Sequence, residues 1–425
     1  MVHAAPRHHR GDAPDLELRF KLLGALLLAY EPLWRPQPFC LPVLPWETHY
    51  PALTAALDAL CETELVALEA DHEALVGWLA AYVPGLAGIL TLDSLPALPT
   101  RYSEYPAGFE RDVPGRKWQQ VSAFAAALDS LDGPVLEWCS GKAHLGRAIC
   151  RRFGTPVTAL EWRAELCAAG NGMSRKLKLD VLLEHCDVLS PDAARYTRRT
   201  RHAVALHACG DLHRRLLETV TAHGIHSLDL SPCCYHLSAS AQYRPFSRAA
   251  AASGLALSRD DCRLAVQETV TAPAATARRR VQKNAWRLGF DALQRQLRGV
   301  NDYLPVPPIP DSVFTGSFAD FCRHAAGLKA LVLPGAVDWP QLEQLGWQRH
   351  ARVSRMELVR HGFRRALELW LVLDRALYLA ECGYYVSVGT FCERHLSPRN
   401  LMIRANRPGG SGHRGHDTPG QCYGL

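Results

Sequence analysis

The strongest constraint on the fold is an alternation of short apolar runs with amphipathic helical segments between residues 134 and 234. The runs are PVLEW (134–138), PVTALE (156–161), LLEHCDVL (182–189), HAVALHA (202–208) and IHSLDLSPCC (225–234). Two of the intervening segments are stopped by Gly154 and Gly224, which suit the last position of a helix. Five strands joined by helical crossovers are typical of a parallel α/β sheet.

The same pattern returns near the end of the sequence. Four apolar residues recur at helical spacing on one face of a predicted helix: Phe363, Leu367, Trp370 and Leu371. The segments YYVSVGTF and RNLMIRA then read as two strands with a short connection. We therefore expect an α/β fold with a seven-stranded, mostly parallel, Rossmann-like sheet and a helical insertion after its fifth strand.

These patterns divide the chain into an N-terminal helical region (1–115), the first part of the core (116–238), a helical basic insertion (239–355), a last helix and strand pair (356–407) and a disordered tail (408–425).

The composition limits the classes of protein that fit this fold. Hydrophobic residues make up 48% of the chain, which is ample for a buried core. The apolar run from Leu22 to Tyr30 is too short to span a bilayer, so we expect no membrane partner. We interpret the fourteen scattered cysteines as reduced thiols of a cytoplasmic protein.

The turn after the first predicted strand is unusually poor in glycine. Glu137 closes the strand, and CSGKA (139–143) forms the turn. Neither G-x-G-x-x-G nor G-x-x-x-x-G-K-S/T is present, which argues against a pyrophosphate cofactor and against a nicotinamide-dependent oxidoreductase. An acid and a lysine here suit a cofactor that carries an ammonium and a carboxylate. Cys139 and Ala143 can replace glycine if neither adopts a positive φ, whereas Gly141 is the one position where only glycine is expected to fit.

Two further acids follow the next two predicted strands. Glu161 closes the second strand, where a carboxylate can accept both ribose hydroxyls of a nucleoside, and Asp187 follows the third, where it can accept an adenine amine. Any one of these acids alone is more simply a surface residue or a helix cap. Three acids at consecutive strand ends favour a nucleoside cofactor, and S-adenosylmethionine carries all the groups that they would recognise.

Several stretches carry a resemblance to a known family. EWCSGKAHLGR, VALHACGDL, SPCCYH and LVLDRALYLAECGYY…HLSPRNLMIRA resemble S-adenosylmethionine-dependent methyltransferases that include the methyltransferase-like proteins named after a ribosomal RNA adenine dimethylase domain, and bacterial relatives. The matched stretches span residues 116–238 and 356–405. In RKWQQV (116–121) the paired basic residues match the family, but its usual His-Glu is missing. Ala143 stands where the family has glycine, and its added methyl would crowd the cofactor.

The resemblance implies a class I methyltransferase fold that uses S-adenosyl-L-methionine as its cofactor. Together with the strand-end argument it implies the following cofactor-binding residues: Lys117, Glu137, Cys139, Ser140, Gly141, Lys142, Leu145, Glu161, Trp162, Asp187, Val188 and His207.

The fourth and fifth strand ends supply the candidate catalytic residues. His207 and Asp211 lie in LHACGDLH (206–213), where a general base would accept a proton from the methyl acceptor, although Asp211 is also a plausible helix cap. Tyr235 in SPCCYH is a candidate for stacking on a flat acceptor base. The same motif contains two cysteines and a histidine, but a paired C-x-x-C…C-x-x-C pattern is missing, so we expect no metal site.

The insertion contains a strongly basic stretch, Arg278–Arg298, with seven basic residues against Asp291. Such a surface suits phosphate contacts, and Trp286 could add base stacking, although a solvated helix face explains the charges equally well. Beside a methyltransferase core, the stretch favours RNA as the acceptor. Two alternatives stay open: a protein methyltransferase, and a catalytically degenerate binding or scaffold protein, favoured by Ala143 and by the missing N/D-P-P-Y/F motif of amino-group methyltransferases.

Overall fold

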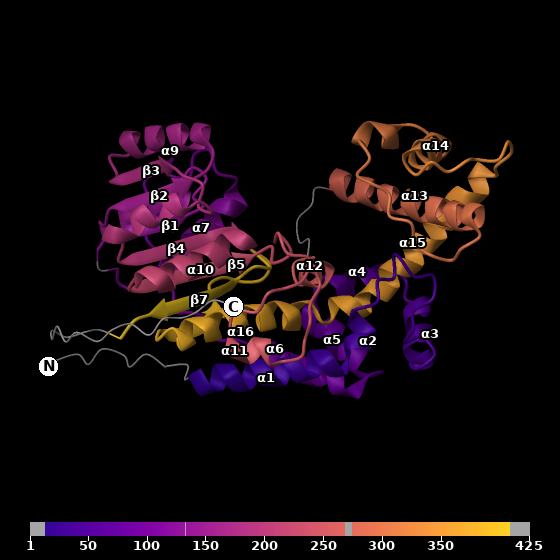
Figure 1. Ribbon diagram of the computed structural model, residues 1–425, viewed down its shortest axis with the longest axis horizontal. Helices are drawn as coiled ribbons and strands as arrows, with labels where there is room; N and C mark the ends of the chain where they lie inside the picture. The colour runs from indigo at the N-terminus through magenta and orange to yellow at the C-terminus, as the bar shows by residue number, and fades with distance from the viewer. Residues whose placement is uncertain (1–12, 132, 268–273, 409–425) are drawn as a thin grey trace. The chain divides into compact units, whose positions relative to one another are not determined.

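The computed structural model describes residues 13–131, 133–267 and 274–408, and it divides them into two compact units (Figure 1). The first unit contains residues 13–27, 92–267 and 365–408, and the second contains residues 28–91 and 274–364. Much of the N-terminal helical region and much of the insertion therefore fall within one unit, and the segment boundaries given above remain predictions.

The first unit is built on one sheet of seven strands. Its strands are β1 (Val135–Trp138), β2 (Val157–Glu161), β3 (Val181–His185), β4 (His202–Cys209), β5 (Ser227–Cys233), β6 (Tyr385–Thr390) and β7 (Leu401–Asn406). They lie in the order β3-β2-β1-β4-β5-β7-β6; β1 to β5 are parallel, and β7 is antiparallel to both β5 and β6. The predicted Rossmann-like fold, with its returning strand pair, is confirmed.

Helices cover this sheet on both faces. Those lying wholly or mostly in the first unit are α1 (Ala13–Ala29), α7 (Gly115–Ala127), α8 (His144–Phe153), α9 (Ala164–Lys176), η2 (Pro191–Arg199), α10 (Asp211–His223), α11 (Arg248–Ala251), α12 (Arg259–Leu264) and α16 (Arg364–Glu381). Gly154 and Gly224 end α8 and α10 in the left-handed conformation, as predicted. In α16, Trp370 is fully buried and stacks on Phe20 with ring centroids 4.9 Å apart.

A buried ionic cluster joins the late strand β7 to the parallel strands. Asp229 in β5 is 1% exposed; it accepts hydrogen bonds from His202 of β4 at 2.9 Å and from Arg404 of β7 at 3.0 Å. Burial opposes ionisation of Asp229, but Arg404 and His202 together hold its pKa below the ordinary value. The cluster therefore fixes β7 against β5 by charge as well as by backbone pairing.

The second unit is helical. Its elements are α2 (Glu31–Trp34), α3 (Pro51–Ala59), α4 (Glu62–Ala70), α5 (His72–Ala80), η1 (Pro84–Ala87), α6 (Gly88–Asp93), α13 (Ala274–Arg298), η3 (Asp311–Thr315), α14 (Phe318–Leu328) and α15 (Trp339–His361). An aromatic core between α13, η3 and α14 includes Phe290, Phe314 and Phe321. The predicted helical character of the insertion is confirmed. Across the described ranges of both units, every helix is too short or too polar to cross a membrane.

Candidate functional site

The turn between β1 and α8 has an unusual backbone. Cys139, Gly141 and Ala143 all lie in the left-handed region, with φ values of 58°, 59° and 54°. Only Gly141 was expected to need this conformation, so that part of the sequence interpretation is wrong. Alanine and cysteine adopt it here at a steric cost of about 1–2 kcal/mol each, which marks the turn as a conformation imposed by its surroundings.

This strain gives a first prediction. Ala143→Gly removes a buried methyl group, worth about 0.8 kcal/mol, but it also relieves the left-handed strain of about 1–2 kcal/mol. We expect the free energy of unfolding to change by less than about 1 kcal/mol. The matched control is Ala148→Gly, at an equally buried position inside α8. There the same change should cost about 2 kcal/mol, because no strain is relieved and helix propensity is lost. Urea unfolding measures both, and equal losses would contradict the strain argument.

Glu137 lies buried beneath the start of α8. The residue is 4% exposed, and its Oε2 accepts a hydrogen bond from the Gly146 backbone N–H at 2.9 Å. Burial raises the pKa of Glu137 to about 8, although the Gly146 N–H, Arg147 and Lys117 all favour its ionised form. Gly146 is needed for this contact, because a Cβ there would lie 2.5 Å from Oε2. At neutral pH, Glu137 is thus a largely protonated acid.

Glu161 connects the end of β2 to the turn. Its Oε2 accepts from the Gly141 N–H at 2.9 Å, and its Oε1 accepts from the Arg163 N–H at 3.0 Å. The side chain is mostly buried. Each carboxylate oxygen retains a further lone pair for a ligand. The structure thus brings Glu161 directly against the predicted cofactor turn, while its role toward a ribose stays a prediction.

Cys139 lies in the turn beside Glu161. Burial raises the pKa of the Cys139 thiol, and the charge of Glu161 raises it further. Asp187 is exposed, and its Oδ1 accepts from the Leu189 N–H at 2.9 Å. This contact turns the chain away from the sheet, so β3 ends at His185 rather than at residue 189 as predicted.

The remaining predicted cofactor residues flank these acids. Trp162, directly after β2, is 66% exposed, and Val188 is buried. Leu145 is buried in α8, and the backbone carbonyl of Lys142 accepts a hydrogen bond from Arg147 at 2.6 Å. The hydroxyl Oγ of Ser140 is buried and has no hydrogen-bond partner among the described residues. A buried hydroxyl without a partner is costly unless a ligand completes it.

His207 belongs to a short polar chain that the sequence did not reveal. Its Nε2 lies 2.8 Å from Gln120 Oε1, and Gln120 Nε2 donates to Ser397 Oγ at 2.9 Å. Since the amide oxygen accepts, Nε2 carries the proton and Nδ1 is left as an acceptor. The residue is exposed, but desolvation of its ring lowers the pKa of His207, and Lys117 adds to that effect. Gln120 lies in RKWQQV, at the position where the family's usual Glu is missing.

The other two candidate catalytic residues have structural contacts. Asp211 is the first residue of α10, and its Oδ2 accepts from the Ala239 N–H at 2.7 Å, which holds the loop after β5. Tyr235 is 3% exposed, with its ring against His213 at 5.9 Å and the Arg375 guanidinium 4.8 Å from its centroid. Its ring has no open face for an acceptor base, so the predicted stacking role of Tyr235 is wrong for this arrangement.

The basic stretch of the second unit separates into two halves. In the later half, Trp286 is 4% exposed and donates a hydrogen bond to Glu343 at 2.9 Å. Trp286 is therefore a core residue, whereas the sequence predicted that it stacks on a base. Arg295 pairs with the buried Asp291 at 2.9 Å, and Arg298 donates to Gln294 at 2.7 Å.

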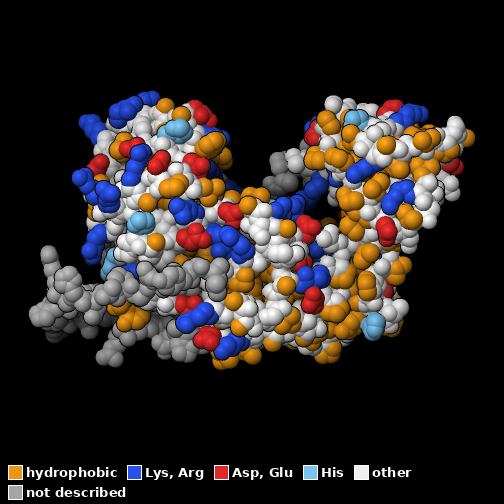
Figure 2. All heavy atoms as spheres, viewed as in Figure 1, with side chains coloured by type: hydrophobic (Ala, Val, Ile, Leu, Met, Phe, Trp, Pro, Cys, Tyr) orange, Lys and Arg blue, Asp and Glu red, His pale blue; other side chains and the backbone are white. Residues whose placement is uncertain are grey.

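The earlier half of α13 presents its cations to solvent. Arg278, Arg279 and Arg280 are exposed, and Lys283 pairs with Asp311 at 2.6 Å. A surface pocket of about 280 Å³ lies here, lined by Thr276, Arg279, Arg280, Lys283, Asn284, Arg287 and Asp311. We call Arg279, Arg280, Lys283 and Arg287 the α13 cation cluster. Figure 2 shows Lys and Arg side chains at the surface where α13 lies.

Residues 116–241 match the family model described as a methyltransferase domain. No curated protein sequence matches the chain.

Several solved structures are similar to part of it. A Pyrococcus abyssi tRNA (uracil-54, C5)-methyltransferase with S-adenosyl-L-homocysteine is 14% identical over 27% of this chain and 27% of its own, with a TM-score of 0.21. A Clostridium acetobutylicum S-adenosylmethionine-dependent methyltransferase is 15% identical over 28% and 50%, with a TM-score of 0.22. Coclaurine N-methyltransferase with N-methylheliamine is 14% identical over 51% and 60%, with a TM-score of 0.23. The chain spans less than two thirds of each of these proteins.

Proposed function

We propose that this chain is an S-adenosylmethionine-dependent methyltransferase whose acceptor is RNA. The observation that carries the proposal is the pair of buried strand-end acids beside the turn: Glu161 accepts from the Gly141 N–H at 2.9 Å, and Glu137 accepts from the Gly146 N–H at 2.9 Å. In a parallel α/β sheet the ligand lies beyond the carboxyl ends of the strands, where these acids are found. The methyltransferase-domain match over residues 116–241 supports the same reaction class.

The residues of the turn fit this cofactor. Glu137, a buried acid with a raised pKa, would ionise opposite the ammonium of the cofactor, and the unpartnered Ser140 hydroxyl would gain a bond to its carboxylate. Glu161 would accept the ribose hydroxyls. Trp162 and Asp187 would contact the adenine. When bound, the cofactor supplies a methyl group on a sulfonium, which a nucleophile can attack directly.

His207 is our candidate for handling the acceptor's proton. Its lowered pKa keeps the ring neutral, and the Gln120 contact fixes the proton on Nε2. The free lone pair on Nδ1 can then accept the proton that a nucleophilic acceptor releases. Gln120 and Ser397 act as positioning residues that hold the ring orientation.

RNA as the acceptor rests on the α13 cation cluster. Neutralising phosphates with Lys and Arg releases condensed counterions, so binding by such a cluster falls with salt. Replacing Arg279, Arg280 and Lys283 together with glutamine should therefore weaken binding to many RNA sequences. The salt slope should fall by about 0.7 for each lost phosphate contact on single strands. Fluorescence anisotropy with a labelled single-stranded RNA, measured across salt concentrations, gives both quantities.

A matched control tests whether position matters more than charge. Arg248, Arg263 and Arg323 are exposed cations outside the cluster, with side chains 88%, 57% and 57% exposed. Their triple glutamine variant has the same net charge and should keep the wild-type salt slope. If both triple variants lose the same affinity, binding reflects overall charge, and the α13 cation cluster is not an RNA site.

Transfer of a tritiated methyl group tests the reaction itself. Full-length protein is incubated with labelled S-adenosylmethionine and either total RNA or total protein from cells. We expect label in RNA. Label in protein alone would make the chain a protein methyltransferase, while cofactor binding without transfer to either would favour the degenerate binding protein.

A further inference from the structure

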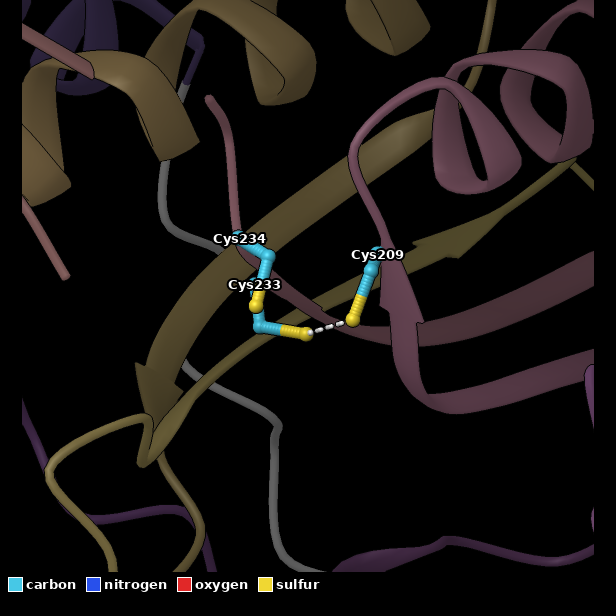
Figure 3. Close-up of side chains that lie close together, drawn as sticks. All are labelled: Cys209, Cys233 and Cys234. Carbon is cyan, nitrogen blue, oxygen red and sulfur yellow. Dashed lines mark hydrogen bonds between the residues drawn. The ribbon is translucent and has the colours of Figure 1, made fainter. Parts of the chain in front are cut away.

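Three cysteine thiols meet at the carboxyl ends of β4 and β5. The pairing of these strands shifts register between Leu206 and Cys209, and this shift places Cys209 opposite Cys233. Cys234 follows directly. All three Sγ atoms lie within 4.8 Å of one another, and those of Cys209 and Cys233 are 3.2 Å apart. Figure 3 shows the Cys209 and Cys233 side chains pointing toward each other from neighbouring strands.

We propose that Cys209, Cys233 and Cys234 together bind one Zn²⁺ ion. Zinc is held by thiolates at about 2.3 Å, so three sulfurs around one tetrahedral ion lie about 3.8 Å apart. The Cys209–Cys233 sulfur separation of 3.2 Å is shorter than that value, and the other two sulfur pairs lie within 4.8 Å, so small side-chain rotations would meet the tetrahedral spacing. Three soft sulfur ligands select a thiophilic ion over magnesium or calcium. This proposal replaces the sequence-based expectation of no metal, which rested on the missing paired C-x-x-C…C-x-x-C pattern.

The backbone around the thiols supports a built site. Cys234 and His207 lie in the left-handed region, with φ values of 48° and 69°. A cysteine that merely fills space in a core does not need this conformation, and such strain persists where the surroundings impose it. At Gly210 (φ 55°) a Cβ would lie 1.8 Å from the Leu237 carbonyl oxygen, so glycine allows the loop after β5 to close against the end of β4.

A neighbouring histidine supplies a second, independent observation. His236 Nδ1 is buried without a hydrogen-bond partner in the described chain. His236 follows Cys234 by two residues at the end of β5. Structural zinc sites have four ligands, whereas catalytic sites keep one position for water. The ring nitrogens of His236 do not lie within 4.8 Å of all three sulfurs, so His236 becomes the fourth ligand only if its ring moves, and water is the other occupant.

Metal content of the full-length chain tests the proposal. Protein purified under reducing conditions, freed of loosely bound ions, should contain about one zinc per chain by mass spectrometry of the elements, as the single site requires. Cys209→Ser and Cys233→Ser should each lower this content at least fivefold. Cys167→Ser and Cys262→Ser are matched controls, because both residues are buried cysteines outside the cluster and should leave the zinc content unchanged.

Cobalt replacement keeps the test valid if the serine variants fail to fold. Wild-type protein titrated with Co²⁺ should show thiolate-to-cobalt charge-transfer absorption that saturates at one equivalent and is displaced by zinc. His236→Ala should change the cobalt spectrum if His236 is the fourth ligand and leave it unaltered if water is. The proposal is overturned if the wild-type chain shows no charge-transfer band, contains copper in place of zinc, or has a Cys209–Cys233 disulfide when freshly purified.

Discussion

Replacing Glu161 with alanine is expected to weaken binding of S-adenosylmethionine by about 10- to 100-fold. Hydrogen bonds to a charged group contribute about 1.5–3 kcal/mol, and about 1.4 kcal/mol corresponds to tenfold in affinity. The loss has two sources. The ribose hydroxyls lose their acceptor, and the Gly141 N–H loses the partner that holds the turn. Isothermal titration calorimetry measures the change directly.

Two further variants separate these sources. Glu165→Ala removes an exposed acid four residues away, in the first turn of α9, and should leave cofactor affinity unchanged. Glu161→Gln retains one oxygen to accept from Gly141 but loses the charge, so its affinity should lie between those of wild type and Glu161→Ala. Wild-type affinity in Glu161→Ala would remove Glu161 from the cofactor site.

Replacing Glu137 with glutamine is expected to stabilise the protein at alkaline pH while weakening cofactor binding. The folded-state pKa of Glu137 is about 8, well above its ordinary value of 4.5. The stability that its neutral form provides is therefore fully present below about pH 4.5 and is lost as the pH rises toward 8. Glutamine is permanently neutral and can still accept from Gly146. At pH 8 we expect Glu137→Gln to exceed wild type by about 4 kcal/mol in unfolding free energy, and at pH 5 by about 1 kcal/mol.

Urea unfolding of both proteins at pH 5, 7 and 8 measures this difference. Glu165→Gln, an exposed acid changed in the same way, should show no such pH-dependent gain. A gain in Glu137→Gln that is the same at every pH would mean that the carboxyl does not titrate in this window. Cofactor affinity should fall in the same variant, because an amide cannot ionise opposite an ammonium, so stability and binding are expected to change in opposite directions.

The sequence was most informative where the physical cause is local. Apolar runs and glycine stops depend on neighbouring residues, and they predicted the seven strands and the ends of two helices. The length of β3 was overestimated because the apolar pattern continues to residue 189. The chain turns after β3, where the Asp187 side chain accepts a hydrogen bond from the Leu189 N–H.

The incorrect predictions concern residues whose surroundings are formed by distant segments of the chain. Tyr235 and Trp286 both lie in polar or basic stretches, which favoured an exposed, stacking role. Their burial depends on Arg375 and on Glu343, far along the chain. The positive φ of Cys139 cannot be predicted from its residue type, because a non-glycine residue adopts this conformation only where the surrounding fold imposes it.

The link between Asp229 and Arg404 has a consequence for biosynthesis. These residues are 175 positions apart, yet Arg404 is one of the two side chains that keep the buried Asp229 ionised. While the chain emerges from the ribosome, β1 to β5 are complete long before β7 exists. Until residue 404 is released, β5 is an unpaired edge that carries an incompletely neutralised acid, which is costly to bury. Folding of the first unit is therefore completed only after its last strand pair has been synthesised, and until then this edge is accessible to chaperones.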